Sequence, residues 1–290
     1  MDKQPLLFED NLSGWKLDVD IPAPISSKYP PPLEEIPHVL TSIQQVGDLF
    51  ESLAYIRFSE HKQFFFRGHS NSDYKLMSSI GRLNLVDYSI EYDIYYNLKA
   101  VLQSDVYSHF RLPSFNEELF YYGIGRHLGL ICRLLDWTAG FWEALSFSLY
   151  DSFNKDGSLW IMMLPNDYPI ENRSPFSIQD NDIHILKEDY YYPDDYTRFP
   201  LGIQRRSHQH GFFSVVKESW ISIPLNDIPV ESHLRFFHFT IPKEVKDLLR
   251  KDKRIIDVDK WLYIEEKSPI LNDIKLLNNR ITSMDDNGRR

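Results

Sequence analysis

The chain of 290 residues is long enough to bury a large core, and its 42% hydrophobic and 14% aromatic content exclude a disordered polypeptide. Its 42 acidic against 32 basic residues give a net charge of -10, which argues against broad binding to duplex nucleic acid or to an anionic membrane. Cys132 is the one cysteine, which excludes an intrachain disulfide. Because neither a signal peptide nor an apolar run of about 18 residues is present, we expect a cytoplasmic protein.

The first segment, residues 1–40, is predicted to be an extended arm that precedes the folded domain. Residues 21–37 contain six prolines, and proline disfavours helix interiors and central strands. Apolar residues at helical spacing in "TSIQQVGDLFESLAYI" then predict a helix that begins after Thr41 or Ser42. The following "QFFFRG" predicts a short buried strand that ends at Gly68.

Helical patterns dominate the next part of the chain. Residues 88–106 predict an amphipathic helix, and "NEELFYYGIGRH" predicts a second helical segment. If "CRLLDWT" forms a turn of helix, Arg133 and Asp136 lie three positions apart and are close enough to pair. Thr138 is expected to cap a buried helix over about residues 139–151, and the apolar run "GSLWIMML" predicts a strand.

The second half of the chain alternates a long polar segment with strand-like pieces. Residues 165–200 are rich in Pro, Asp, Asn and Tyr, which is typical of a lid, a binding loop or a disordered segment. The segments "GFFSVV", "SWISIPL" and "HLRFFHFTIP" predict strands, and Pro242 suits the first turn of a following helix. An amphipathic segment then precedes a polar tail, residues 276–290. The order of elements predicts an α+β fold, with one mixed domain over residues 41–275 and a central, mostly antiparallel sheet flanked by helices.

Two groups of polar residues in the first half are candidates for function. Arg67 stands at the end of a buried strand beside Gly68, where it can clamp a phosphate or carboxylate, with His69 and Ser70 within reach. The alternative is an Arg–carboxylate bridge that ties the strand to a helix. Arg133 and Asp136 either form a buried structural pair or line a pocket whose floor is Trp137, and His127 precedes them on an accessible turn.

A third polar group is "QRRSHQHGFFSV", just before a predicted strand. His208 and His210 could share a strand face and bind a metal, but two further ligands at a suitable spacing are lacking, so we predict no metal site. A buried Cys132 is more typical of a small hydrophobic residue than of a catalytic thiol. No Walker loop, nucleophile elbow, zincin motif or dinucleotide fingerprint is present.

Taken together, these motifs resemble the FRG domain family, which is named for its Phe/Tyr-Arg-Gly motif. The family pattern has a hydrophobic-Arg-Gly strand, a His-x-Gly-x-x-Thr-Arg-Leu-Leu-Asp-Trp-Thr segment, an Ala-Leu-x-Phe helix and a later Arg-x-x-x-Gln-x-Gly-x-Phe motif. It falls here on Arg67, Gly68, His127, Gly129, Arg133, Leu134, Leu135, Asp136, Trp137, Thr138, Ala144, Leu145, Phe147, Arg205, Gln209, Gly211 and Phe213. The chain departs from it at Arg126, where glutamine is usual, and at Ile131-Cys132, where Pro-Thr is usual. The resemblance covers roughly residues 42–270.

The arrangement is also similar to the ADP-ribosyltransferase group, which implies NAD as the cofactor and an effector of toxin or anti-phage defence type. By that resemblance Arg67 and Gly68 hold the phosphates of NAD, and His69 or His127 binds a ribose hydroxyl. Trp137 or Phe213 stacks on the nicotinamide, while Gln209, Glu218 or Asp136 faces the ribose. Arg133, Thr138 and Arg205 complete the implied cofactor-binding residues. The Gln/Glu-x-Glu pair that is usual in that group is not found after the third motif.

Two other classes of function stay open. One is a nucleic-acid enzyme or binder that uses Arg67, Arg126, Arg133, Arg205 and Arg206 as a local phosphate-binding cluster, which a steep dependence of affinity on salt would reveal. The other is a noncatalytic module that senses a nucleotide-like ligand or a protein. In that case the N-terminal arm or residues 165–200 are the expected protein contact.

Overall fold

In the computed structural model, the residues described are 30–83, 85, 87–103, 117–187, 211–229, 234–262 and 270–288. The helices are α1 (Ile43–Ser59), α2 (Ile90–Leu102), α3 (Glu117–His127), α4 (Phe141–Leu149), α6 (Lys243–Leu249), α7 (Lys253–Leu262) and α8 (Ile270–Gly288). The strands are β1 (Lys62–His69), β2 (Leu135–Thr138), β3 (Gly157–Pro165), β4 (Ile170–Glu171), β5 (His184–Leu186), β6 (Gly211–Val215) and β7 (Arg235–Ile241). Short 3-10 helices are η1 (Leu33–Glu35), η2 (Gly81–Leu83), η4 (Pro175–Ser177), η6 (Glu218–Trp220) and η7 (Leu225–Asp227).

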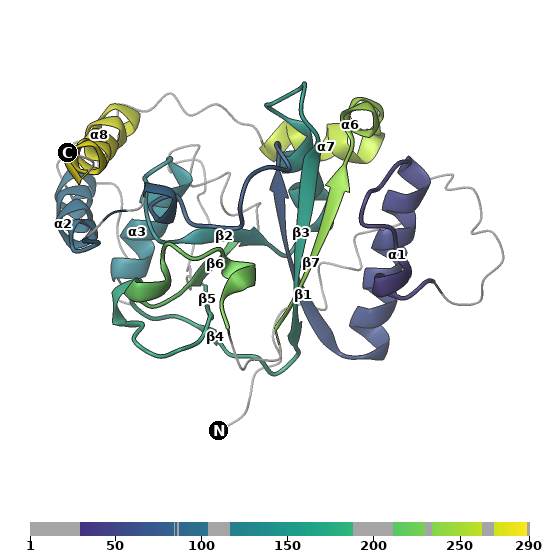
Figure 1. Ribbon diagram of the computed structural model, residues 1–290, viewed down its shortest axis with the longest axis horizontal. Helices are drawn as coiled ribbons and strands as arrows, with labels where there is room; N and C mark the ends of the chain where they lie inside the picture. Colours follow the sequence, from purple (N-terminus) through teal and green to yellow (C-terminus); the bar gives the residue numbers. More distant parts are fainter. Residues whose placement is uncertain are drawn as a thin grey trace.

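The strands of this described part form a seven-stranded sheet in the order β4-β5-β6-β2-β1-β3-β7. All neighbours pair antiparallel except β4 and β5, which pair parallel. The long strands β1, β3 and β7 run along one another, whereas β2 and β6 cross the view at a steep angle to them (Figure 1). A single register pair, Phe66 with Thr138, joins β1 to β2 at this bend. The mixed α+β fold and the mostly antiparallel sheet are therefore confirmed.

One hydrophobic core lies between β1, β3 and β7 and the helices α1, α4, α6 and α7. Alternation along β1 sends Phe64 and Phe66 to this side, where Phe66 meets Phe141 of α4 edge-on at 5.7 Å. The helices contribute one apolar stripe each, because a helix face repeats every three or four residues. The buried helix residues of this core are Val46, Leu49, Leu53, Phe141, Trp142, Ala144, Leu145, Leu149, Val245, Leu249, Ile255 and Val258.

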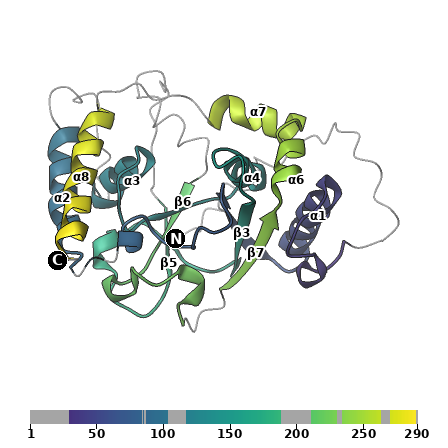
Figure 2. The same cartoon turned by 45° about the horizontal axis from the view of Figure 1, so that its top comes forward.

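A second core lies on the other face, where the bent part of the sheet meets α2, α3 and α8. Helix α8 lies beside α2 in both views (Figures 1 and 2), and Leu277 and Ile281 of α8 are buried in this core. Because α8 extends to Gly288, much of the segment 276–290 is helical, although its composition suggests a polar tail. Phe65 of β1 faces the same core and contacts Phe212 of β6 at 4.4 Å between ring centroids.

Several local signals in the sequence act as expected. Ser42 caps α1, because its hydroxyl accepts a hydrogen bond from the Gln45 amide at 3.2 Å. Pro242 immediately precedes α6, where its missing amide hydrogen costs nothing. The predicted strands "GFFSVV" and "HLRFFHFTIP" correspond to β6 and β7. Leu33 and Leu40, at the end of the predicted N-terminal arm, are buried in the core with α1.

Two local predictions are wrong, and one condition is not met. The condition was a turn of helix at "CRLLDWT", where residues 135–138 form the strand β2. The helix after it begins at Phe141 with Gly140 as its N-cap, and the Thr138 hydroxyl instead accepts a bond from the Gly140 amide at 3.0 Å. "SWISIPL" forms η6 and η7 rather than a strand, because Pro224 has no amide hydrogen to donate to a sheet.

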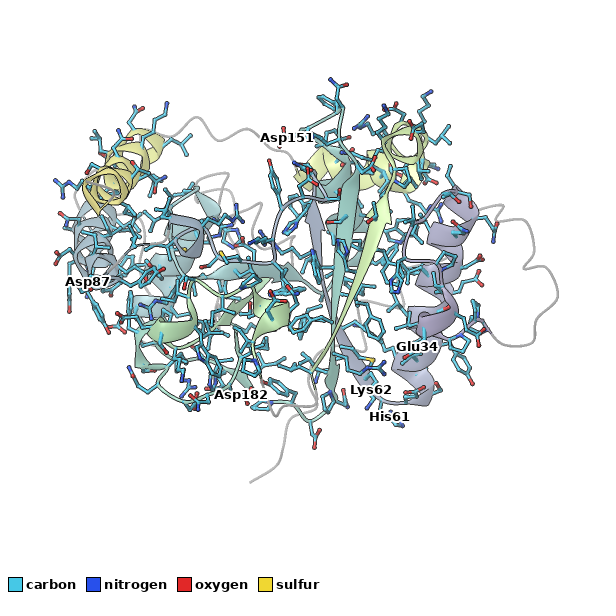
Figure 3. All side chains as sticks on the ribbon, in the orientation of Figure 1. Glu34, His61, Lys62, Asp87, Asp151 and Asp182 are labelled. Atoms are coloured by element: carbon cyan, nitrogen blue, oxygen red, sulfur yellow. The ribbon has the colours of Figure 1, made fainter. Side chains whose placement is uncertain are left out.

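The segment 165–200 is also less irregular than its composition suggests. Its described part, up to residue 187, supplies β4, η4 and β5. Acidic side chains such as Asp87, Asp151 and Asp182 lie at the periphery of the molecule (Figure 3), in keeping with an acidic exterior.

Candidate functional site

The candidate site forms at the bend of the sheet, where Arg67 of β1 reaches across to β2. Its Nη1 donates to the backbone carbonyl of Asp136 at 2.6 Å and lies 3.4 Å from Oδ2 of the same residue. The side chain of Arg67 is 13% exposed. The carboxylate partner of Arg67 thus comes from a neighbouring strand, whereas the structural alternative predicted a tie to a helix.

The Asp136 carboxylate is shared between two arginines. Arg126, in the last turn of α3, donates through Nε at 2.8 Å and approaches through Nη2 at 2.6 Å, both to Oδ2. Burial raises the pKa of Asp136, but the charges of Arg126 and Arg67 outweigh it and bring the pKa to about 2. Asp136 is therefore ionised at neutral pH, with 30% of its side chain exposed.

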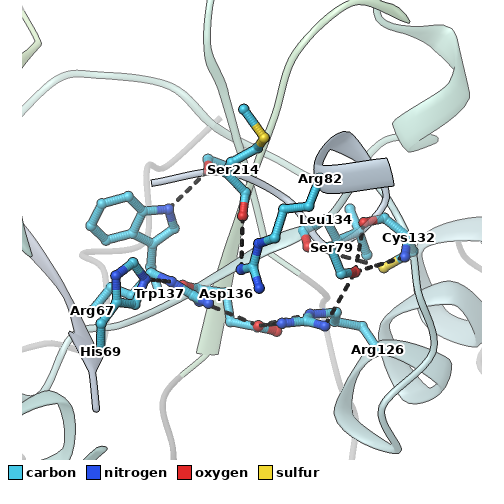
Figure 4. Close-up of polar contacts among 11 residues, drawn as sticks. Arg67, His69, Ser79, Arg82, Arg126, Cys132, Leu134, Asp136, Trp137 and Ser214 are labelled. Carbon is cyan, nitrogen blue, oxygen red and sulfur yellow. Dashed lines mark hydrogen bonds and ion pairs between the residues drawn. The ribbon is translucent and has the colours of Figure 1, made fainter. Parts of the chain in front are cut away.

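Arg82 in η2 supplies a third guanidinium, which lies above Asp136 and between Trp137 and Arg126 (Figure 4). Its Nη2 donates to the Met77 carbonyl at 3.1 Å. None of the described carboxylates forms an ion pair with it. Arg82 is exposed, and partial desolvation and then the charge of Arg126 lower its pKa. We call Arg67, Arg82 and Arg126, with Asp136, the arginine cluster.

The arginine cluster carries more positive than negative charge, because three guanidinium groups face one carboxylate. The pKa of Arg67 falls to about 10. Burial is the main cause; the charges of Arg126 and Arg82 add to it, and Asp136 opposes it. An anion bound here would relieve the repulsion between the arginines.

His69 orients Arg67 from the same face of β1. Its Nε2 accepts a hydrogen bond from Arg67 Nε at 3.0 Å, and the residue is 4% exposed. Burial, followed by the charges of Arg67 and Arg82, lowers the pKa of His69 to about 2. The imidazole is therefore neutral, and since Nε2 accepts, the proton resides on Nδ1.

Arg133, a predicted binding residue, lies apart from this cluster. Its Nε donates to Glu91 Oε2 at 2.7 Å, and its backbone amide donates to Glu91 Oε1 at 2.9 Å. The Tyr122 hydroxyl also donates to Oε1. The proposed pairing of Arg133 with Asp136 is wrong, because Arg133 precedes β2 and pairs with Glu91, whereas Asp136 pairs with Arg67 and Arg126.

Trp137, Thr138 and Phe213 surround the cluster as buried residues. The Trp137 indole is 2% exposed and donates to Ser214 Oγ at 2.9 Å. Phe213, 1% exposed, pairs in register with Asp136 and contacts the His127 ring at 5.7 Å. His127 is close enough to Asp136 for its charge to lower the pKa of that carboxyl further.

Gly68, the second motif residue of β1, lets the strand approach α4. A side-chain carbon at this position would lie 1.9 Å from the Ala144 carbonyl oxygen and 2.7 Å from the Ser148 amide nitrogen. Gly68 is thus required for packing the helix on the strand. The close approach fixes the position of Arg67 relative to the core.

The remaining predicted site residues lie elsewhere or outside the described residues. Glu218 is an exposed residue of η6, and its charge acts on Tyr88 and Arg133. Gln209 and Arg205 lie outside the described residues, as do Arg206, His208 and His210. Within the described ranges, no group of three or more His, Cys, Asp or Glu residues is arranged to hold a metal ion. The helices of this part also include none with the length and apolarity to cross a membrane.

Sequence reasoning named Arg126 only in the nucleic-acid alternative, and it did not name Arg82. Arg126 is visible in the sequence as a departure from the family pattern, and its charge is what holds Asp136. Arg82 belongs to no motif, and only the fold brings it to the site.

Comparison with protein families now identifies this region. The family model of the FRG domain matches residues 62–157. Residues 62–157 carry an FRG domain. All four members of the arginine cluster lie within this FRG domain, as does Gly68. No curated protein and no solved structure matches the chain.

Proposed function

We propose that the FRG domain binds the diphosphate of a nucleotide at the arginine cluster, and that the nucleotide is NAD. The excess charge of Arg67, Arg82 and Arg126 over Asp136 supports this proposal. Guanidinium groups match phosphate oxygens in pairs and stay charged under all physiological conditions. NAD is favoured by the similarity to the ADP-ribosyltransferase group, in which an aromatic-Arg-Gly strand holds the phosphates.

Under this proposal the protein is an ADP-ribosyltransferase or an NAD glycohydrolase, of the kind used by toxins and anti-phage effectors. The bond between nicotinamide and ribose breaks, and its electron pair leaves with the nicotinamide. Water or a target nucleophile adds to the ribose carbon and loses a proton. Asp136 is the ionised carboxylate of the cluster, and we assign it to face the positive charge that develops on the ribose.

The burial of Arg67 and Arg126 favours a small anion over a nucleic-acid backbone as the ligand of the cluster. The side chains of Arg67 and Arg126 are only 13% and 16% exposed, so a ligand must enter the bend of the sheet to reach them. A nucleic-acid binder instead presents exposed cations along its surface and loses affinity steeply with salt. Measuring affinity at two salt concentrations distinguishes the two.

The experiment is to incubate the full chain with labelled NAD, and to measure binding and released nicotinamide separately. Arg82→Gln removes a guanidinium that has no ion-pair partner among the described residues, so it is expected to fold and to bind at least about tenfold more weakly. Arg235→Gln makes the same change at an exposed arginine paired with Glu34, and should bind normally.

The outcomes separate the alternatives. Binding with nicotinamide release supports the enzymatic proposal, and binding without release points to a noncatalytic sensor. If the wild-type chain binds no nucleotide, or if the Arg82 and Arg235 variants behave alike, the arginine cluster is a structural network and the proposal fails.

A further inference from the structure

A row of polar side chains, each with one unpaired polar atom, lies next to the arginine cluster on the same face of the sheet. In the register of β1 and β3, His69 is opposite Ser158 and Arg67 is opposite Trp160. In the register of β3 and β7, Trp160 is opposite His238. Alternation places these residues on the face that carries Phe65 and Met162. We call His69, Ser158, Trp160 and His238 the polar row.

Each member of the polar row has one buried polar atom without a hydrogen bond of normal geometry, and His69 also lies near the Tyr74 backbone. These atoms are His69 Nδ1, Ser158 Oγ, Trp160 Nε1 and His238 Nε2. Ser158 is 0% exposed and His69 is 4% exposed. Buried polar groups are nearly always satisfied in folded proteins, since leaving one unpaired costs stability. Unpaired groups at adjacent register positions therefore mark buried donors and acceptors that a ligand entering the bend of the sheet would satisfy.

The chemistry of the row defines what it can bind. His69 Nδ1 and Trp160 Nε1 carry hydrogens and are donors, while the Ser158 hydroxyl can donate or accept. Because His69 is neutral, the row complements uncharged acceptor atoms. Such acceptors are ribose oxygens, carbonyl oxygens and ring nitrogens of nucleobases.

Aromatic rings border the same region. The rings of Trp160 and His238 lie 4.3 Å apart with a 34° tilt. Tyr74 is 45% exposed and stands edge-on to His69 at 6.1 Å; its hydroxyl also acts electrostatically on Arg82. Aromatic side chains beside unpaired donors are typical of sites for planar heterocycles.

We propose that the polar row is the subsite for the nucleoside part of the ligand whose phosphates lie on the arginine cluster. The inference rests on the proposed function, which supplies the phosphate position. The two subsites are continuous, because Arg67 Nε donates to Nε2 of His69 (Figure 4). The protein should therefore distinguish a nucleotide from a bare diphosphate.

The test uses two probes, ADP and inorganic pyrophosphate, and measures both affinities by calorimetry. Ser158→Ala and Trp160→Phe each remove one unpartnered group and preserve most of the side-chain shape. We expect each to weaken ADP binding about tenfold and to leave pyrophosphate binding unchanged. Thermal stability should stay constant or rise, because the folded protein loses no hydrogen bond. Trp142→Phe, on the opposite face of the sheet, should change neither affinity.

Each outcome decides one of the two ideas. If pyrophosphate binds as tightly as ADP, and both variants bind ADP normally, the nucleoside subsite is refuted while the anion site stands. If Ser158→Ala destabilises the protein without ligand, the row is an internal hydrogen-bond network and the inference is also refuted. If neither probe binds, the proposed function fails and takes the subsite with it.

Discussion

Replacing Glu91 by glutamine should destabilise the protein severely, although the change adds no bulk. Glu91 is 0% exposed and is the counterion of Arg133, whose side chain is 3% exposed. Its two carboxylate oxygens accept bonds from the Arg133 side chain, the Arg133 amide and the Tyr122 hydroxyl. An amide in its place removes the charge and one acceptor, and leaves a buried cation unpaired.

The magnitude follows from the burial of both partners. Water does not weaken the attraction between these two groups, because both are buried. Removing one partner of such a pair costs about 3–5 kcal/mol of unfolding free energy. Replacing both partners, Glu91→Leu with Arg133→Met, should recover most of that loss, since no charge is then left buried. The double-mutant cycle isolates the coupling between the two residues.

The assay is denaturant unfolding of the wild type, the single variants and the double variant. Asp73→Asn is the matched control, because it makes the same carboxylate-to-amide change in a pair that is 59% and 73% exposed and 3.7 Å apart; its effect should stay within about 0.5 kcal/mol. A loss of less than about 1 kcal/mol in Glu91→Gln, or a double variant as unstable as the singles, would refute the buried ion pair.

Three further predictions concern single positions. The folded-state pKa of His69 is about 2, below the ordinary 6.5. The contribution of His69 to stability is therefore full above about pH 6.5 and is lost as the pH falls from there toward 2, because the unfolded chain takes up the proton first. His69→Gln should flatten the fall in stability between about pH 7 and pH 5, measured by denaturant midpoints. Gly68→Ala should unfold the protein or lower its unfolding free energy severely, because the new carbon would lie 1.9 Å from the Ala144 carbonyl oxygen. Gly47→Ala in α1 is the control, since a carbon there meets nothing within 4 Å. It should raise the unfolding free energy by about 0.5–1 kcal/mol, measured by thermal melts. Burial raises the pKa of Cys132 to about 12, so a maleimide should label this thiol only after unfolding, and rapid labelling of the folded protein would contradict its burial.

Local patterns were sufficient for most of the individual elements. Apolar residues at helical spacing after Ser42, and the continuous apolar run of residues 157–164, predict α1 and β3 because one buried face leaves a period in the sequence. "SWISIPL" has a similar composition but forms η6 and η7. Its Leu225 amide bonds to the Leu76 carbonyl in a loop, a contact that no local pattern contains.

The family motif located the centre of the site without giving its partners. Arg67 and Asp136 belong to the motif and do meet, at 3.4 Å. Arg133 belongs to the same motif, yet it pairs with Glu91, which lies 42 positions earlier in the chain. The pairing of Arg133 with Asp136 was conditional on a turn of helix at "CRLLDWT", and the segment instead leads into the strand β2.

By itself the sequence determined the class of the fold, the FRG segment and the presence of a buried arginine beside Gly68. The fold class depends on composition and on short-range periodicity, whereas the FRG segment was found by the resemblance of its motifs to that family. Only the tertiary structure decided that Arg82 and Arg126 join Arg67 around one carboxylate, and that the polar row lies beside them. Which charges share a site is set by the pairing of distant strands, and the energy of each charge then depends on how much water that pairing excludes.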